Sequence, residues 1–244
     1  MASRGIGYIN YFQPNMIPDV MLWLDGKDVL GDGSSVGDNS IDTWVDKSAQ
    51  KNDAVQGTGN DQPFYNSLVQ GVGFGSTQDM SGTFTQSLSG NLDWSFAAVL
   101  WAENITGDVR VAAGIGEIPG GAPFEKALVF GANGLSDNKT VIALWTGSES
   151  GAAGTQATEM YSAMGTYRAS DRQTVAYWNS TAGTPGTGGN ALNLTSNTFH
   201  LGNVPGAAYR WDGYIFELLM FNHVLTAQER AVLRTYFNQK WKIF

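Results

Sequence analysis

The chain has 244 residues, a formal net charge of −8 and no cysteine, and only 15% of its residues are charged. The lack of cysteine excludes a thiol nucleophile, a cysteine zinc site and a disulfide framework. An acidic chain also lacks the clustered cations that nucleic acid binding requires, and no run of about 18 apolar residues occurs that would span a membrane. We therefore expect neither a nucleic acid partner nor membrane insertion.

Residues 1–19 predict an irregular arm ahead of the domain. Pro14 and Pro18 prevent regular strand pairing there. The start of the sequence has no apolar core or small-residue cleavage site typical of a secretory signal, so we expect no export by that route. An aromatic arm of this kind packs either on the domain itself or on a neighbouring subunit. We expect docking on a neighbour, and therefore a homo-oligomer or an assembly with other subunits. The candidate docking residues are Tyr8, Ile9, Tyr11 and Phe12.

Residues 20–244 predict one β-domain. The first apolar run, VMLWLDG (20–26), is typical of a strand covered on both faces. In IDTWVDKS (41–48) the side chains alternate with a period of two, which indicates a second strand. Many short strands with Gly-rich connections predict an all-β fold of two antiparallel sheets. Further strands are expected at 95–103, 108–116, 126–132, 140–147, 173–180, 199–204 and 212–222.

One helix is expected at the end of the domain, over residues 226–241. Thr226 and Glu229 have the spacing of a capping box, in which each residue satisfies the other's backbone N–H. The apolar residues then recur on one helical face. We expect this face, with Trp241 at its end, to pack on the sandwich.

Two segments resemble those of the concanavalin A-like, laminin-G-type jelly rolls. The first is LWLDGKDV (22–29) followed by TWVDKSAQKNDAVQ (43–56). The second resembles the closing segment of that family and contains Gly213, Ile215, Glu217, Phe221, Asn222, Leu225, Thr226, Glu229, Arg230, Lys240 and Trp241. The resemblance implies a two-sheet jelly roll that hosts lectins, polysaccharide-cleaving enzymes, adhesion modules and phage particle proteins. It also implies structural roles for Trp44, Asp46, Glu217, Thr226, Glu229 and Trp241.

Catalytic patterns are few. His223 lies between Glu217 and Glu229 in the sequence, but Glu229 is assigned to the helix cap and the histidine to a turn. The paired carboxylates with which glucanases of this fold cleave glycosides, on alternate residues of one strand, do not occur. Lyase patterns built on a strand histidine are missing as well, since His200 stands in TFHLG and Tyr167-Arg168 is assigned to a turn. These observations predict a non-enzymatic protein.

Binding residues are sought among aromatic side chains, because sugar rings stack on them. Tyr209, Arg210 and Trp211 form one candidate platform, and Trp145 and Trp178 end strands beside polar loops. The alternative is that most of the eight tryptophans pack in the core. No cofactor and no metal site are assigned. Calcium remains an alternative at Asp32, Asp38 and Asp42, without a defined set of ligands.

The sequence leaves three functions open. The first is a structural protein of a virion, a capsid decoration, head fibre or tail component that also binds host glycans; low charge, polar loops and the arm favour it. The second is an extracellular or cell-surface carbohydrate-binding or adhesion module. The third is a polysaccharide lyase or glycoside hydrolase of the same fold. We expect the first, located in the virion.

Overall fold

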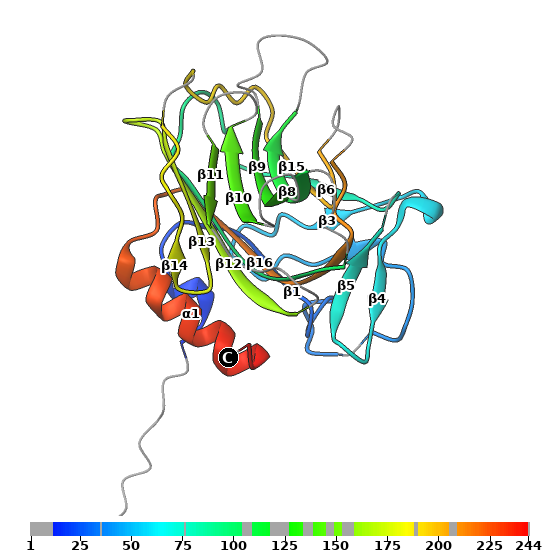
Figure 1. Ribbon diagram of the computed structural model, residues 1–244. Helices are drawn as coiled ribbons and strands as arrows, with labels where there is room; N and C mark the ends of the chain where they lie inside the picture. The colour runs from blue at the N-terminus through cyan, green and yellow to red at the C-terminus, as the bar shows by residue number, and fades with distance from the viewer. Residues whose placement is uncertain are drawn as a thin grey trace, which may run out of the picture.

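The computed structural model describes residues 12–34, 36–75, 77–103, 109–117, 127–133, 139–144, 149–152, 159–187, 190–204 and 209–243. Two antiparallel eight-stranded sheets pack face to face, and one helix covers the outer face of one of them (Figure 1). The expected all-β sandwich with a C-terminal helix is confirmed. None of the described helices is long and apolar enough to cross a membrane.

The sheet beneath the helix is sheet A, and the other is sheet B. Sheet A has the order β14 (Thr181–Ala182), β13 (Gln173–Trp178), β12 (Tyr161–Arg168), β7 (Trp94–Ala102), β16 (Gly213–Phe221), β5 (Gly71–Phe74) and β4 (Phe64–Asn66), with β1 (Val20–Asp25) paired to β16. Sheet B has the order β11 (Glu149–Ala152), β10 (Lys139–Leu144), β9 (Ala127–Asn133), β8 (Val109–Gly116), β15 (Thr198–Leu201), β6 (Met80–Thr83), β3 (Ala54–Val55) and β2 (Thr43–Trp44). Two single-turn helices, η1 (Pro14–Met16) and η2 (Gly59–Asp61), lie in the connections.

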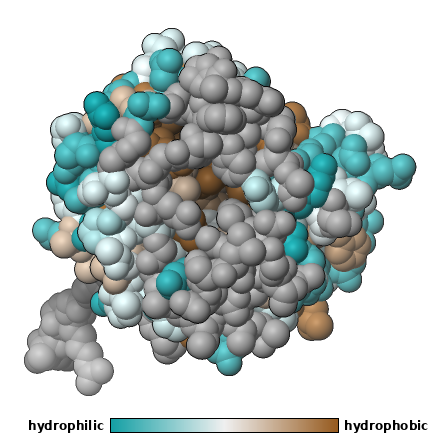
Figure 2. Space-filling view, turned by 45° about the horizontal axis from the view of Figure 1, so that its top comes forward, coloured by the Kyte–Doolittle hydropathy of each residue, from teal (hydrophilic) through white to brown (hydrophobic). Residues whose placement is uncertain are grey.

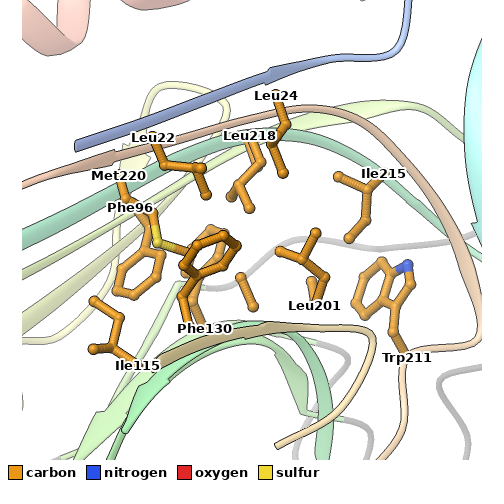
Figure 3. Close-up of a cluster of buried hydrophobic side chains, with 14 of the residues drawn as sticks. Leu22, Leu24, Phe96, Ile115, Phe130, Leu201, Trp211, Ile215, Leu218 and Met220 are labelled. Carbon is orange, nitrogen blue, oxygen red and sulfur yellow. The ribbon is translucent and has the colours of Figure 1, made fainter. Parts of the chain in front are cut away.

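The core lies between the two sheets. Strand alternation directs Leu22 and Leu24 of β1 inward. They meet Phe130 and Leu201 of sheet B, and every one of these side chains is buried (Figure 3). Trp211, which precedes β16 of sheet A, fills the same interior (Figure 3). Face-to-face packing of this kind buries the inner side of each strand and leaves the outer sides for other contacts.

Helix α1 (Ala227–Trp241) covers the outer face of sheet A with Leu233, Phe237 and Trp241. The expected capping box is confirmed: Thr226 Oγ1 accepts from the Glu229 backbone N–H at 3.2 Å, and Glu229 Oε2 accepts from the Thr226 N–H at 2.7 Å. This reciprocal pair satisfies two backbone groups at the helix start.

Two sequence-based assignments are corrected by the structure. The strand expected over residues 41–48 is reduced to Thr43–Trp44. Beyond it the chain turns around the buried carboxylate of Asp46, which accepts from the backbone N–H groups of Trp23, Ser48 and Asn52 at 2.7–2.8 Å. Residues 161–168, partly assigned to a turn, form β12, an interior strand of sheet A between β13 and β7. All of its residues except Arg168 are buried, which is typical of a strand covered on both faces.

Candidate functional site

The outer face of sheet B carries a row of side chains that crosses seven of its strands. The pairing register places Thr43, Val55, Ser81, His200, Gly114, Val129 and Ala143 opposite one another in turn. Phe199 and Leu201 point into the core. His200 between them therefore faces outward, because neighbouring strand residues alternate between faces.

His200 is the distinctive polar group of this face. Its side chain is buried, with 7% of the residue exposed. The ring bonds to the backbone of Gly116, but its Nε2 atom has no hydrogen-bond partner among the described residues. Burial lowers the pKa of His200 to about 4, against the opposing effect of the Gly116 bond. The imidazole is therefore neutral near pH 7.

Apolar side chains pack beside His200. Val111, Ala127, Val129 and Val204 form a cluster separate from the main core. The neighbour of His200 in the row is Gly114, and a Cβ atom there would lie 2.4 Å from Val204 Cγ2. Figure 2, which brings the upper side of Figure 1 forward, shows apolar residues at the bottom of a hollow on that side. Apolar side chains around a small number of polar groups are typical of the lining of ligand sites.

The platform expected at Tyr209, Arg210 and Trp211 is only partly suited to ligand contact. Tyr209 is half-buried and packs against the apolar cluster beside His200. Arg210 is half-buried, with Nη1 3.1 Å from the Thr77 carbonyl oxygen and 3.7 Å from Asp79 Oδ2. Trp211 needs correction, because its side chain is fully buried in the core and offers no face for stacking.

The other candidate binding residues lie apart from this face. Trp178 is half-buried, ends β13 of sheet A and packs against the main core. Phe12 packs on the chain's own helix, with its ring 5.9 Å from that of Tyr236. Trp145, Tyr8, Ile9 and Tyr11 lie outside the described residues.

Glu217 joins the last strand to the helix and to β1. Its Oε1 atom accepts from Trp23 Nε1 at 2.8 Å and from Tyr236 Oη at 2.7 Å. Its Oε2 atom accepts from Trp241 Nε1 at 2.6 Å and contacts Lys240 Nζ at 3.0 Å. Glu217 is fully buried, and both oxygens are occupied. We call these five residues the clasp.

The clasp extends to a second carboxylate. Asp25 is the cross-strand partner of Glu217, and Lys240 Nζ lies 2.7 Å from Asp25 Oδ1. Burial raises the pKa of Glu217. For Asp25 burial acts in the same direction, but Lys240 and Lys47 outweigh it and lower the pKa. Pairs with separated pKa values occur in active sites, yet here every oxygen of Glu217 is bonded to protein. These bonds connect β16, β1 and helix α1.

The histidine near the helix start lies beside the helix cap, and neither of its ring nitrogens makes a hydrogen bond with the described residues. His223 Nε2 lies 3.4 Å from Glu229 Oε2, and Glu229 forms the helix cap. Glu217 belongs to the clasp instead. The three residues that are neighbours in the sequence therefore form no common site.

Two of the three aspartates of the acidic turns bind backbone N–H groups, Asp32 within its own turn and Asp38 in a segment 29 residues away. Asp32 Oδ1 accepts from the Ser34 N–H at 2.8 Å, and Asp38 Oδ1 accepts from the Ser67 N–H at 2.6 Å. Within the described part of the chain, no group of three or more His, Asp or Glu residues is arranged to hold a metal ion. Calcium at Asp32, Asp38 and Asp42 stays an untested alternative.

Sequence reasoning missed His200. It tested this residue only against a lyase pattern. The alternation of Phe199, His200 and Leu201 was the available signal, because it places a histidine on the face opposite two core residues. Its cross-strand neighbour Gly114 comes from a distant segment of the chain, and only the strand register brings the two residues together.

No family model and no curated protein matches the chain. Several solved structures do. An arabinofuranosidase complexed with arabinofuranosyl-α-1,2-xylobiose matches with a TM-score of 0.60 and 14% identity, over 81% of this chain and 50% of that one. Trypanosoma rangeli sialidase matches with a TM-score of 0.57 and 15% identity, over 92% of this chain and 33% of that one. The present chain thus spans half or less of these two proteins.

A third match is to a single domain. Domain 4 of AbnA, a GH43 extracellular arabinanase from Geobacillus stearothermophilus, in complex with arabinotriose, matches with a TM-score of 0.52 and 11% identity, over 88% of this chain and 98% of that one. The expectation of a non-enzymatic virion protein is contradicted by these likenesses, which are to glycosidases and to a saccharide-bound domain of an arabinanase. The chain has the β-sandwich fold found in these carbohydrate-active proteins.

Proposed function

We propose that the chain is a carbohydrate-active domain that binds a saccharide on the outer face of sheet B. The observation that carries this proposal is the unpartnered Nε2 atom of His200 on an apolar floor. The arabinotriose complex of the arabinanase domain supports it, because that domain matches over nearly its whole length. An extracellular or cell-surface location accords with such a role.

The chemistry of His200 suits a sugar hydroxyl. A neutral imidazole has one donor and one acceptor nitrogen. Since the other ring nitrogen bonds to the Gly116 backbone, which favours the proton there, Nε2 is the acceptor. A hydroxyl group can donate to it while the C–H face of the sugar stacks on Tyr209, the half-buried aromatic residue that packs against the apolar cluster. Asn203 adds a second buried acceptor, since its Oδ1 is also without a partner among the described residues.

Calorimetric titration with arabinotriose, xylobiose and a sialyl-oligosaccharide tests this proposal. We expect one of them to bind the wild-type chain, and His200→Gln to weaken that binding roughly tenfold or more, because a buried acceptor loses its position. The chain has only two histidines, so His223→Gln is a matched control that should bind as the wild type does. Equal binding by His200→Gln and the wild type would refute the proposed site.

Hydrolysis of a glycosidic bond is the second candidate function. The likeness to an arabinofuranosidase, with a TM-score of 0.60, favours it. Retaining hydrolysis needs two carboxyl groups about 5 Å apart, and the clasp carboxylate Glu217 is fully bonded. Release of 4-nitrophenol from 4-nitrophenyl α-L-arabinofuranoside by the folded chain would establish hydrolysis. Saccharide binding without release would leave binding as the function.

A further inference from the structure

A polar groove runs between helix α1 and the β13–β14 hairpin, on the side of the sandwich opposite to sheet B. It consists of two adjoining cavities of about 450 and 300 Å³ that share Asn179, Ser180 and Arg234. The larger cavity is otherwise lined by Thr235, Asn238 and Gln239. This lining of amide, hydroxyl and guanidinium groups is separate from the His200 face.

Two arginines stand one helical turn apart along this groove. Arg230 and Arg234 have the spacing i, i+4, at which like charges destabilise a helix. Arg230 is engaged: its guanidinium lies over the Tyr177 ring at 4.4 Å and donates to the Leu225 carbonyl oxygen. Arg234 is half-buried and makes no ion pair or hydrogen bond with the described residues. It is therefore the cation that remains free for a ligand.

Among the described residues, no acidic side chain lines the groove. Neither set of lining residues contains Asp or Glu, although the chain carries a net charge of −8. Arg168, at the end of β12, differs from Arg234 in having a carboxylate partner, because its Nε lies 3.0 Å from Asp171 Oδ1. A guanidinium without a carboxylate partner is complementary to a ligand carboxylate, which it binds through two parallel N–H donors.

The hairpin wall of the groove is fixed in place. Asn179 has a left-handed backbone conformation, with φ of 51°. Its N–H donates to the Ser162 carbonyl oxygen at 2.8 Å, and its Oδ1 accepts from the Ser162 N–H at 3.0 Å. These bonds tie the hairpin tip to β12. A wall fixed before binding lowers the entropic cost of association.

We propose that this groove binds an acidic saccharide, with Arg234 holding the sugar carboxylate and the hydroxyl and amide groups beside it contacting the sugar hydroxyls. The arrangement makes it a second saccharide site, independent of the sheet B face. A negatively charged ligand also relieves the repulsion between Arg230 and Arg234.

Titration with trigalacturonic acid and with its neutral methyl ester tests the proposal. We expect the acid to bind, the methyl ester to bind roughly tenfold more weakly, and Arg234→Gln to lose binding of the acid by a similar factor. Arg168→Gln is the matched control, because it removes the same charge from an exposed strand end. Unchanged binding by Arg234→Gln, or an equal loss in both variants, would overturn the site.

Three further measurements distinguish this site from a general anion site and from the His200 face. Inorganic sulfate at the same concentration should fail to displace the acid; if it displaces the acid fully, the groove holds an adventitious ion only. Arg234→Gln should leave binding at the His200 face unchanged, and His200→Gln should leave binding of trigalacturonic acid unchanged. Loss of acid binding in His200→Gln would place the ligand on sheet B and refute the groove.

Discussion

Replacing Glu217 by glutamine tests whether the clasp stabilises the fold. Glutamine keeps one carbonyl oxygen but presents an NH₂ group where Oε1 or Oε2 stood. Each carboxylate oxygen now accepts from an indole N–H, of Trp23 or of Trp241. The amide NH₂ group cannot accept a hydrogen bond. At whichever position it takes, one indole N–H and the second donor to that oxygen would lose their acceptor.

The expected loss follows from these contacts. A buried group left unsatisfied costs about 1–3 kcal/mol, and two such groups give about 3 kcal/mol. Lys240 retains its contact with Asp25 at 2.7 Å, so its charge stays paired. Against a total stability of about 5–15 kcal/mol, this loss is large. For a domain of this size it lowers the melting temperature by roughly 6–12 °C.

Urea unfolding followed by tryptophan fluorescence and scanning calorimetry measures this loss. The exposed Glu159, changed to glutamine, is the control and should alter stability by less than about 0.5 kcal/mol. Removal of a catalytic carboxylate often stabilises a protein, because active sites sacrifice stability for function. A Glu217→Gln variant that melts at or above the wild-type temperature would refute the structural assignment.

Three other predictions concern the site and the helix. His200→Gln should flatten the pH dependence of stability, so that between pH 7 and 4 the wild type loses about 3 kcal/mol more than the variant. The reason is that the imidazole of the unfolded chain takes up a proton below its ordinary pKa of 6.5, whereas the folded one does so only near 4. Parallel stability curves of the two proteins in urea titrations would contradict this. Thr226→Ala should reduce the unfolding free energy by about 1 kcal/mol through loss of the helix cap, and an unchanged urea midpoint would contradict it. Gly114→Ala should weaken saccharide binding at the His200 face, since the new methyl group lies against Val204; calorimetry that shows equal affinity in a folded variant would show that the floor does not contact ligand.

Much of the fold is predictable because local rules and tertiary packing agree. The capping box at Thr226 and the continuous apolar run of β1 need no distant partner to be recognised. The segment 161–168 was harder, because Gly165 and Thr166 interrupt its apolar pattern. A Cβ atom on Gly165 would lie 2.9 Å from Ile142, so sheet packing selects that glycine. Such a requirement is visible only after the two sheets are assembled.

The candidate site is less predictable for the same reason. Trp211 and Tyr209 are two residues apart, yet one is fully buried and the other packs beside the His200 face. Aromatic character alone cannot separate these outcomes. The free guanidinium of Arg234 depends on a hairpin that lies more than 50 residues earlier in the sequence. Neither site is a local motif; each is formed by strands or helices that meet through the topology.

The clasp also constrains the order in which the protein folds. Trp23 and Glu217 are 194 residues apart, and among the described strands β1 pairs with β16 alone. Contacts between such distant segments form slowly, because a long loop must close before they contribute. During synthesis the apolar strand β1 has no sheet to join until β16 has left the ribosome. Until then Leu22 and Leu24 of the nascent chain are exposed apolar residues on an unpaired strand, which makes this stage prone to aggregation unless another molecule covers them.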